Sequence, residues 1–451
     1  MSAAAGLAKQ LGYEVTGSDS KELYEPAKGV LDKEKIPYFL GYDAKNISAS
    51  KADLFIASSG EDLANPEMEF LEQRKIPYYS FAELLAEMNR DKLRIVVTGT
   101  HGKSTTAAIL GYLLQNLDNS SFMTGGVLRN YNLNFHFGTG HYAVFEGDEY
   151  KALWNDSTPK FHYYKPDILV LTNLEFDHPD LFFSLEELKQ EFQRLIENMP
   201  EDGLIVYNAD DVNLSQLVYK TNVASVGFAV KQPAEFQAQN LKFFPETSFE
   251  LKFKNKTEEE TVEQYSTGLP GLINVYNSTA ALAALRTLGF SAESLMTLLQ
   301  DFQGLKRRFE IIGEKNGITI IDDYAHHPTE VRETLLAARS KFPDKRIWAV
   351  FEPHTFSRTK ATLNDLAQSF APANKVLIAE IYPARENLSS ANITSKEVME
   401  EVSKYHKDAR LVKNKQQALN TLIKEVKTDD VVIIMAVGNF NTLAQNLIQK
   451  L

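Results

Sequence analysis

Short apolar runs alternate with amphipathic stretches along most of the chain. Strand-like runs occupy residues 93–98, 168–172 and 204–207, and a helical pattern occupies residues 105–117. Parallel strands that are covered by helices on both faces are near-continuous runs of Val, Ile and Leu. The pattern therefore predicts an α/β fold built on parallel sheets.

The first 90 residues show a weaker form of the same alternation. We expect helices at 2–11 and 25–34, and strands at 13–19 and 52–57. A parallel α/β sheet normally opens with a strand and a Gly-rich turn before its first helix. This sequence opens on the helix instead, so we expect the chain to start inside a domain whose first strand is missing.

Two further segments extend the predicted organisation. Polar and apolar residues alternate from 234 to 265, which predicts antiparallel strands, and an Ala-rich helix is expected at 277–288. Beyond residue 306, four more strands are expected, separated by helices. They are Ile318–Ile321, Ile347–Phe351, Val376–Ile381 and Val431–Ala436.

Length and composition narrow the class of protein. A chain of 451 residues is too long for one core, and we predict three domains, at 1–90, 91–305 and 306–451. The net charge of -12 argues against a main role in coating nucleic acid or an anionic membrane. No apolar run is long enough to span a membrane, and the N-terminus lacks the basic region of a secretory signal.

The chain contains no cysteine, which excludes disulfides, zinc thiolate sites, iron–sulfur clusters and cysteine nucleophiles. Such a composition fits a reducing compartment, and we expect a cytoplasmic protein.

The sharpest chemical signal is the run Thr98–Thr106 (TGTHGKSTT), between a predicted strand and a predicted helix. Glycines let backbone N–H groups approach phosphate oxygens at a helix N-terminus. Lys103 can reach the β- and γ-phosphates of a nucleotide, and the Ser104 hydroxyl can bind Mg²⁺. The loop is shorter than the full phosphate-loop motif, because only Gly99 and Gly102 are present. An ordinary Gly-rich turn is the alternative, and the position at a helix start favours nucleotide binding.

This loop resembles that of the Mur ligase family, whose members join amino acids or peptides to UDP-N-acetylmuramate precursors of peptidoglycan. Further motifs are similar to family blocks and follow in the family's order. They are Gly17–Asp19 (GSD), Glu146–Tyr150 (EGDEY), Thr172–His178 (TNLEFDH), Lys306–Glu310 (KRRFE), Asp322–Pro328 (DDYAHHP) and Phe351–Arg358 (FEPHTFSR). The resemblance implies a Rossmann-like N-terminal domain for the UDP-sugar, a central P-loop ATPase domain and a Rossmann-like C-terminal domain that meets the amine.

The resemblance also implies a set of site residues. The catalytic residues would be Lys103, His178 and Arg308. Nucleotide contacts would come from Gly99, Thr100, His101, Gly102, Lys103, Ser104, Thr105, Asn274, Asn277, Arg308 and Asp323. Two Mg²⁺ ions would be held by Ser104, Glu146 and His178. The substrates would be contacted by Ser18, Asp19, Ser58, Ser59, His326, His327, His354 and Arg358. The chain departs from the family at Ile273, where a histidine is usual beside the first asparagine.

The amine substrate is the open question. Some family members carry a modified lysine at a place that falls here near Phe192, and two branches lack it. One branch takes L-alanine, and the other takes L-alanyl-γ-D-glutamyl-meso-diaminopimelate. The insert at 151–166 and residues 24–26 resemble the tripeptide branch, whereas residues 325–331 and 351–358 resemble the alanine branch. We expect the tripeptide.

The implied reaction has two steps. The muramate carboxylate attacks the γ-phosphate of ATP to give an acyl phosphate, and the substrate amine then displaces phosphate. A folate-type polyglutamate ligase is one alternative, and the long N-terminal α/β segment argues against it. A non-catalytic nucleotide-binding regulator is another, and intact Lys103, Glu146 and His178 argue against that.

Overall fold

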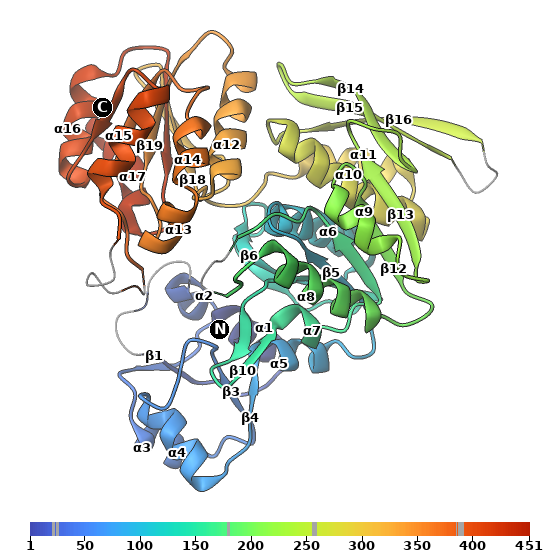
Figure 1. Ribbon diagram of the computed structural model, residues 1–451. Helices are drawn as coiled ribbons and strands as arrows, with labels where there is room; N and C mark the ends of the chain where they lie inside the picture. Colours follow the sequence, from blue (N-terminus) through green and yellow to red (C-terminus); the bar gives the residue numbers. More distant parts are fainter. Residues whose placement is uncertain (20–22, 24–26, 178–180, 255–258, 385, 387–391) are drawn as a thin grey trace.

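The computed structural model describes residues 1–451 except 20–22, 24–26, 178–180, 255–258, 385 and 387–391. Figure 1 shows the N-terminal residues in blue at one end, a central sheet in cyan to green, and the C-terminal residues in orange and red. Parallel strands alternate with helices in all three parts, which confirms the predicted α/β class.

The N-terminal part contains two separate pairs of short parallel strands. Its elements are α1 (Ser2–Gln10), β1 (Gly17–Asp19), α2 (Ala27–Lys33), β2 (Tyr38–Leu40), α3 (Ala44–Ser48), β3 (Phe55–Ala57), α4 (Pro66–Arg74), β4 (Tyr78–Ser80) and α5 (Phe81–Met88). β1 pairs with β2 and β3 pairs with β4, and each strand has three residues. Pro37 and Pro77 stand immediately before β2 and β4. Proline has no backbone N–H to donate, so the hydrogen-bonded pairing of β2 and of β4 does not extend N-terminally past these residues.

The central sheet has ten strands in the order β16-β15-β14-β13-β12-β11-β5-β8-β6-β7. These strands are β5 (Leu93–Thr98), β6 (Ser121–Leu128), β7 (Leu133–His136), β8 (Tyr142–Glu146), β11 (Ile168–Leu171), β12 (Leu204–Asn208), β13 (Ala224–Ala229), β14 (Phe236–Lys242), β15 (Thr247–Lys254) and β16 (Glu260–Thr267). All neighbouring strands between β14 and β6 in this order pair in parallel. β15 pairs antiparallel with β14, β16 with β15, and β7 with β6. The antiparallel segment expected at 234–265 is therefore confirmed.

Helices cover both faces of this sheet. They are α6 (Lys103–Asp118), α7 (Lys160–Tyr163), α8 (Leu185–Glu197), α9 (Val212–Val218), α10 (Leu272–Leu288) and α11 (Ala292–Asp301), and the insert after β8 adds the hairpin β9 (Lys151–Leu153) and β10 (Asp156–Pro159). Ile95 and Val97 of β5 belong to the core shared with α6 and α10, whereas Val96 belongs to the core under α8. Successive side chains of a strand point to opposite faces, which explains this division.

The C-terminal part is a six-stranded sheet in the order β17-β18-β22-β19-β20-β21, with only β17 antiparallel. Its elements are β17 (Glu310–Lys315), β18 (Ile318–Asp323), α12 (Pro328–Lys341), β19 (Arg346–Phe351), α13 (Phe356–Ala361), α14 (Leu363–Ser369), β20 (Lys375–Ile378), α15 (Ser395–Tyr405), β21 (Ala409–Leu411), α16 (Lys415–Glu425), β22 (Asp430–Met435) and α17 (Thr442–Lys450). All four predicted strands are present, and β17 and β21 extend the sheet on either side.

Strand register places the functional motifs at common sheet edges. Thr98, the last residue of β5, pairs with Leu171, and Val97 pairs with Glu146. Loops after β5, β8 and β11 therefore leave the same edge of the central sheet. In the C-terminal sheet, Asp323 and Phe351 both pair with Met435, so the motifs after β18 and β19 leave one edge as well.

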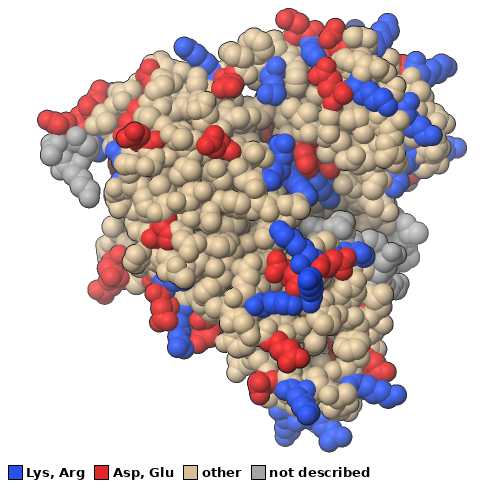
Figure 2. Space-filling model, turned by 180° about the vertical axis from the view of Figure 1, so that it is seen from behind, with Lys and Arg blue, Asp and Glu red and all other residues tan. Residues whose placement is uncertain are grey.

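The surface carries charges of both signs (Figure 2), and the helices give no sign of a membrane-crossing segment within the described residues. Lys and Arg side chains are interspersed with Asp and Glu on the face shown in Figure 2. Among the described residues, no helix combines the length and the apolar character that a membrane crossing requires.

Phe192 tests the core beneath α8. Its side chain is fully buried and meets the Phe161 ring edge-on, with ring centroids 5.6 Å apart. We expect Phe192→Ala to destabilise the protein by about 3–5 kcal/mol, because the truncation leaves a cavity. Chemical denaturation followed by circular dichroism measures the change. Phe183→Ala is the matched control, because Phe183 is 93% exposed and its truncation should shift stability by less than about 0.5 kcal/mol.

Candidate active site

A cavity of about 690 Å³ lies where the three parts of the chain meet. Ser59 lines it from the N-terminal part, Lys103 and Glu146 line it from the central part, and Arg308 and His326 line it from the C-terminal part. The carboxyl edges of both large sheets thus contribute loops to one cleft, which is where open parallel sheets bind ligands.

The phosphate loop connects β5 to α6 through two glycines in left-handed conformations. Gly99 has φ +135° and Gly102, the N-cap of α6, has φ +82°. A Cβ atom on Gly99 would lie 2.2 Å from the Thr172 hydroxyl, and one on Gly102 would lie 2.4 Å from the Asn277 amide oxygen. Both positions therefore require glycine, for backbone conformation and for space.

Lys103 is held inside the cleft by backbone and carboxylate oxygens. Its Nζ donates to the carbonyls of Gly99 (2.5 Å) and Thr100 (3.0 Å) and to Glu149 Oε1 (2.9 Å). Burial opposes the charge of Lys103, but the surrounding carboxylates, Glu149 foremost, raise its pKa. Burial also raises the pKa of Glu149 to about 7, against the attraction of Lys103. Lys103 thus stays protonated, and Glu149 is the partner whose charge changes near neutral pH.

Ser104 and Glu146 form an oxygen-rich pair beside this lysine. The Ser104 hydroxyl donates to Glu146 Oε1 at 2.7 Å, and Glu146 Oε2 accepts from the backbone N–H of Gly125 at 2.5 Å. A hydroxyl and a carboxylate next to a phosphate loop are the donors that Mg²⁺ prefers. The two residues therefore fit the predicted magnesium site. The third expected ligand, His178, lies outside the described residues.

The asparagine pair lies on α10, which begins five residues earlier than predicted. Asn277 Nδ2 donates to Asn274 Oδ1 at 3.1 Å, and the Thr106 hydroxyl donates to Asn277 Oδ1 at 3.2 Å. Both asparagines and Ile273 line the cavity. The helix therefore joins the asparagine pair directly to the phosphate loop.

Arg308 projects from a constrained turn of the C-terminal part. The residues on either side, Arg307 and Phe309, have φ +58° and +47°. Asp323 accepts from the backbone N–H of Phe309 at 2.6 Å and from that of Ala325 at 2.7 Å. Burial opposes the charge of Arg308, but carboxylates in the cleft raise its pKa. Asp323 therefore holds the backbone that presents Arg308, besides lining the cavity itself.

Three residues predicted to face the amine line the cavity: His326, His354 and Arg358. Arg358 is buried, and its Nε and a terminal nitrogen each lie 3.0 Å from Asp177 Oδ1, which joins the C-terminal part to the central part. A second terminal nitrogen lies 3.1 Å from His354 Nδ1. Burial lowers the pKa of His326, so its imidazole is neutral near pH 7.

His327 is placed differently from the other predicted amine-side residues. It is the N-cap of α12, where its Nδ1 accepts from the backbone N–H of Thr329 at 3.3 Å. Its ring faces His101, with centroids 4.6 Å apart, and it is not among the residues that line the cavity.

The residues expected on the uridine side are only partly brought to the cavity. Ser59 lines it, whereas Ser18, Asp19 and Ser58 do not. The Ser18 hydroxyl donates to Glu67 of α4. The Ser58 hydroxyl accepts from the backbone N–H two residues further on, at 3.3 Å.

The structure also shows acidic residues that sequence reasoning left out of the site. They are Glu149, Glu175, Asp177 and Glu330. Glu149, Glu175 and Asp177 stand inside the motifs EGDEY and TNLEFDH, and Glu330 stands inside the segment 325–331, so proximity to a motif was the signal that could have found them. Glu330 closes the capping box of α12 and contacts Arg308 Nη1 at 3.4 Å. Nothing in its local sequence indicated that contact, which only the packing of α12 creates.

Comparisons with known proteins agree with this architecture. Successive models match the chain: the Mur ligase family, catalytic domain at residues 1–92, the Mur ligase middle domain at 97–285, and the Mur ligase, glutamate ligase domain at 307–438. The UDP-N-acetylmuramate–L-alanine ligase of Alkaliphilus metalliredigens is 33% identical over 455 residues, which cover 100% of this chain and 95% of that protein.

Two solved structures also align along the whole chain. The UDP-N-acetylmuramate–alanine ligase of Thermotoga maritima has a TM-score of 0.80 and 25% identity, covering 100% of this chain and 96% of that one. A murein peptide ligase of Psychrobacter arcticus has a TM-score of 0.74 and 27% identity, with the same coverage.

The fold and the cleft define an ATP-dependent ligase made of three α/β domains. The chain belongs to the Mur ligase family, and its members form a C–N bond while ATP is converted to ADP. The predicted family, fold class and enzyme class are therefore confirmed.

The expected tripeptide substrate is wrong. Relatives that match over the full chain at 31–33% identity are alanine ligases, which favours the other branch. The cavity does not separate the branches, because it is lined both by His354 and Arg358 of the alanine-like motif at 351–358 and by Lys160 of the insert at 151–166. The insert at 151–166 forms mainly the β9–β10 hairpin and α7, and residues 24–26 lie outside the described residues.

Gly102 tests the phosphate loop. We expect Gly102→Ala to weaken ATP binding at least tenfold, because the added methyl group meets Asn277 and the backbone must keep a left-handed φ. Isothermal titration with ATP measures the affinity. Gly268→Ala is the matched control, because a Cβ there meets nothing within 4 Å. Equal affinities for both variants would contradict the requirement for glycine at position 102.

Glu149 predicts a pH dependence of nucleotide binding. Below about pH 7 its carboxyl is neutral, and above this pH its negative charge holds Lys103 and repels phosphate. We therefore expect the affinity for ADP to fall as the pH rises from 6 to 8. In Glu149→Gln the affinity should fall less over the same pH range, because the residue can no longer ionise. Ionisation of the nucleotide itself is common to both proteins, so the difference between them reports Glu149. Parallel pH profiles would contradict this assignment.

Proposed function

We propose that this protein is a UDP-N-acetylmuramate–L-alanine ligase that acts in the cytoplasm during peptidoglycan synthesis. The observation that carries the proposal is full-length similarity to alanine ligases at 31–33% identity. The higher TM-score of the alanine ligase structure, 0.80 against 0.74 for the peptide ligase, supports the same branch. Residues 1–90 would hold the UDP-sugar, 91–305 the ATP, and 306–451 the amine.

Activation of the carboxylate is the first step. A muramate carboxylate oxygen attacks the γ-phosphorus of ATP, the bond to the β-phosphate oxygen breaks, and ADP leaves an acyl phosphate behind. Lys103 and Arg308 line the same cavity from different domains and supply positive charge for the phosphoryl group. Mg²⁺ held by Ser104 and Glu146 would add charge neutralisation to this step.

Closure of the cleft assembles the charges needed for this step. Lys103 stands at the start of α6, whereas Arg308 reaches the cleft from the turn before β17. The Arg358–Asp177 pair joins the same two domains at 3.0 Å. Because neither cation alone surrounds the triphosphate, we infer that phosphoryl transfer requires the closed arrangement.

Amide formation is the second step. The alanine nitrogen attacks the acyl carbon, the bond to the phosphate oxygen breaks, and the nitrogen loses a proton. His326 is suited to accept that proton, since burial keeps it neutral. Its Nδ1 lies 2.9 Å from the Tyr324 carbonyl, which can only accept a hydrogen bond. The proton therefore sits on Nδ1, and Nε2 carries the free lone pair.

A phosphate-release assay tests the proposed substrate. The protein is incubated with ATP, Mg²⁺ and UDP-N-acetylmuramate, plus L-alanine, L-alanyl-γ-D-glutamyl-meso-diaminopimelate or L-glutamate. We expect release with L-alanine to exceed release with either other amine at least tenfold. Preference for the tripeptide would restore the peptide-ligase branch, and preference for glutamate would favour a folate-type ligase.

Lys103→Ala is the control for this assay. The substitution removes the cation in contact with the loop carbonyls, and we expect it to abolish release with every amine. Unchanged release in this variant would show that the measured activity does not arise in the cleft, and the proposal would then fail.

A further inference from the structure

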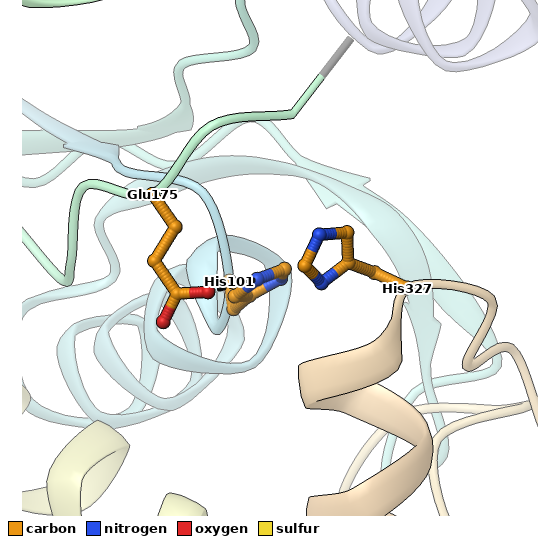
Figure 3. Close-up of side chains that lie close together, drawn as sticks. All are labelled: His101, Glu175 and His327. Carbon is orange, nitrogen blue, oxygen red and sulfur yellow. Dashed lines mark ion pairs between the residues drawn. The ribbon is translucent and has the colours of Figure 1, made fainter. Parts of the chain in front are cut away.

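Three side chains converge where the phosphate loop meets the C-terminal domain. His101 belongs to the loop, Glu175 follows β11, and His327 caps α12 (Figure 3). One ligand atom of each residue lies within 4.8 Å of the corresponding atoms of the other two. Two domains therefore contribute donors to one small volume beside the cleft.

His101 is the least satisfied member of this group. Its residue is 5% exposed, and neither ring nitrogen makes a hydrogen bond within the described part of the chain. The nearest carboxylate oxygens are those of Glu175, 3.5 Å from Nε2, and Glu330, 3.6 Å from Nδ1. Neither contact is as short as a hydrogen bond, so the two buried nitrogens are held only by long ion pairs to carboxylates, and a bound cation would give the imidazole a closer partner.

The chemistry of the donors selects the kind of species. Two imidazoles and one carboxylate suit a borderline divalent cation such as Zn²⁺, whereas Mg²⁺ prefers oxygen. Bonds of about 2.1 Å in a tetrahedral site put two ligand atoms about 3.4 Å apart, so the present spacing of up to 4.8 Å needs to close by roughly 1.4 Å. Closing it requires movement of both imidazoles as well as of the half-exposed Glu175 side chain.

We propose that His101, Glu175 and His327 form a binding site for a borderline divalent cation of the Zn²⁺ type, which cross-links the central and C-terminal domains. Water completes the coordination sphere. The site is separate from the Ser104–Glu146 pair expected to hold Mg²⁺, and it does not depend on which amine the enzyme uses. Thr329 supports it, because its hydroxyl donates to Glu175 Oε2 at 3.0 Å.

Occupation of this site ties the phosphate loop to α12. Two ligands belong to the central domain and one to the C-terminal domain, so the cation holds the domains together as the Arg358–Asp177 pair does. Glu330 on the same helix contacts Arg308. The bound cation therefore also stabilises the position from which Arg308 faces the cleft.

The test measures Zn²⁺ bound to the full chain in the presence of excess Mg²⁺, by equilibrium dialysis and metal analysis. We expect one Zn²⁺ ion per chain (one equivalent) that excess Mg²⁺ does not displace. We also expect the melting temperature of the protein to rise as the Zn²⁺ concentration rises. His327→Asn and Glu175→Gln should each weaken this binding at least a hundredfold. Asparagine is a preferred N-cap residue, so His327→Asn retains the cap of α12 while removing the imidazole.

Two control variants separate this site from other donors. His141 is an exposed histidine paired with Asp118 at 2.8 Å, and His141→Asn should retain the equivalent. Glu146→Gln alters the expected Mg²⁺ site and should retain it too. If His327→Asn fails to fold, Glu175→Gln decides alone, because Glu175 is half-exposed.

Absence of Zn²⁺ binding to the native protein, or an undiminished equivalent in Glu175→Gln, would overturn the proposal. Loss of the equivalent in Glu146→Gln alone would assign the metal to the phosphate-loop pair and would also overturn it. The phosphate-release assay uses Mg²⁺ without Zn²⁺, so failure of this site leaves the alanine ligase proposal standing.

Discussion

Buried cations in the cleft depend on matching carboxylates, and this balance of charge organises the whole site. Lys103 faces Glu149 at 2.9 Å, and Arg308 faces Glu330 at 3.4 Å. Burying an unpaired charge would lower the stability of the fold by several kcal/mol. A carboxylate partner removes most of this cost while no phosphate is bound. A chain with a net charge of -12 can therefore attract a polyanion through a few placed cations.

Parallel sheets make this arrangement possible. The phosphate loop, the Glu146 motif and the Glu175 motif follow neighbouring strands, so they meet at one sheet edge despite wide separation in the chain. The C-terminal sheet does the same for the motifs that carry His326 and Arg358. Placing two such edges opposite each other gives a single cleft whose halves are held by direct contacts. Closure and catalysis are linked because neither half carries all the charges.

Substrate choice was harder to infer than chemistry, and the residues show why. The loop glycines and Lys103 are expected to bind ATP, which the family uses in common, so they carry no information about the amine. Motifs from two branches occur side by side in this chain. Both segments line the cavity, because 351–358 supplies His354 and Arg358 and the insert at 151–166 supplies Lys160. The full-length similarity to alanine ligases, not the cavity lining, therefore decides between the two resemblances.

The amino-acid sequence by itself determined the α/β class, the main strands of both large sheets and the phosphate loop, because these rest on local patterns of hydrophobic residues and glycines. Tertiary structure alone decided the partners of the charged residues. Glu330 meets Arg308 because α12 packs beside the turn before β17 within the C-terminal domain, and Asp177 meets Arg358 because α13 packs against the central domain. The contact of the His327 ring with that of His101 is likewise a result of packing between the two domains. Contacts between distant segments depend on how whole sheets are placed, and no local pattern records that.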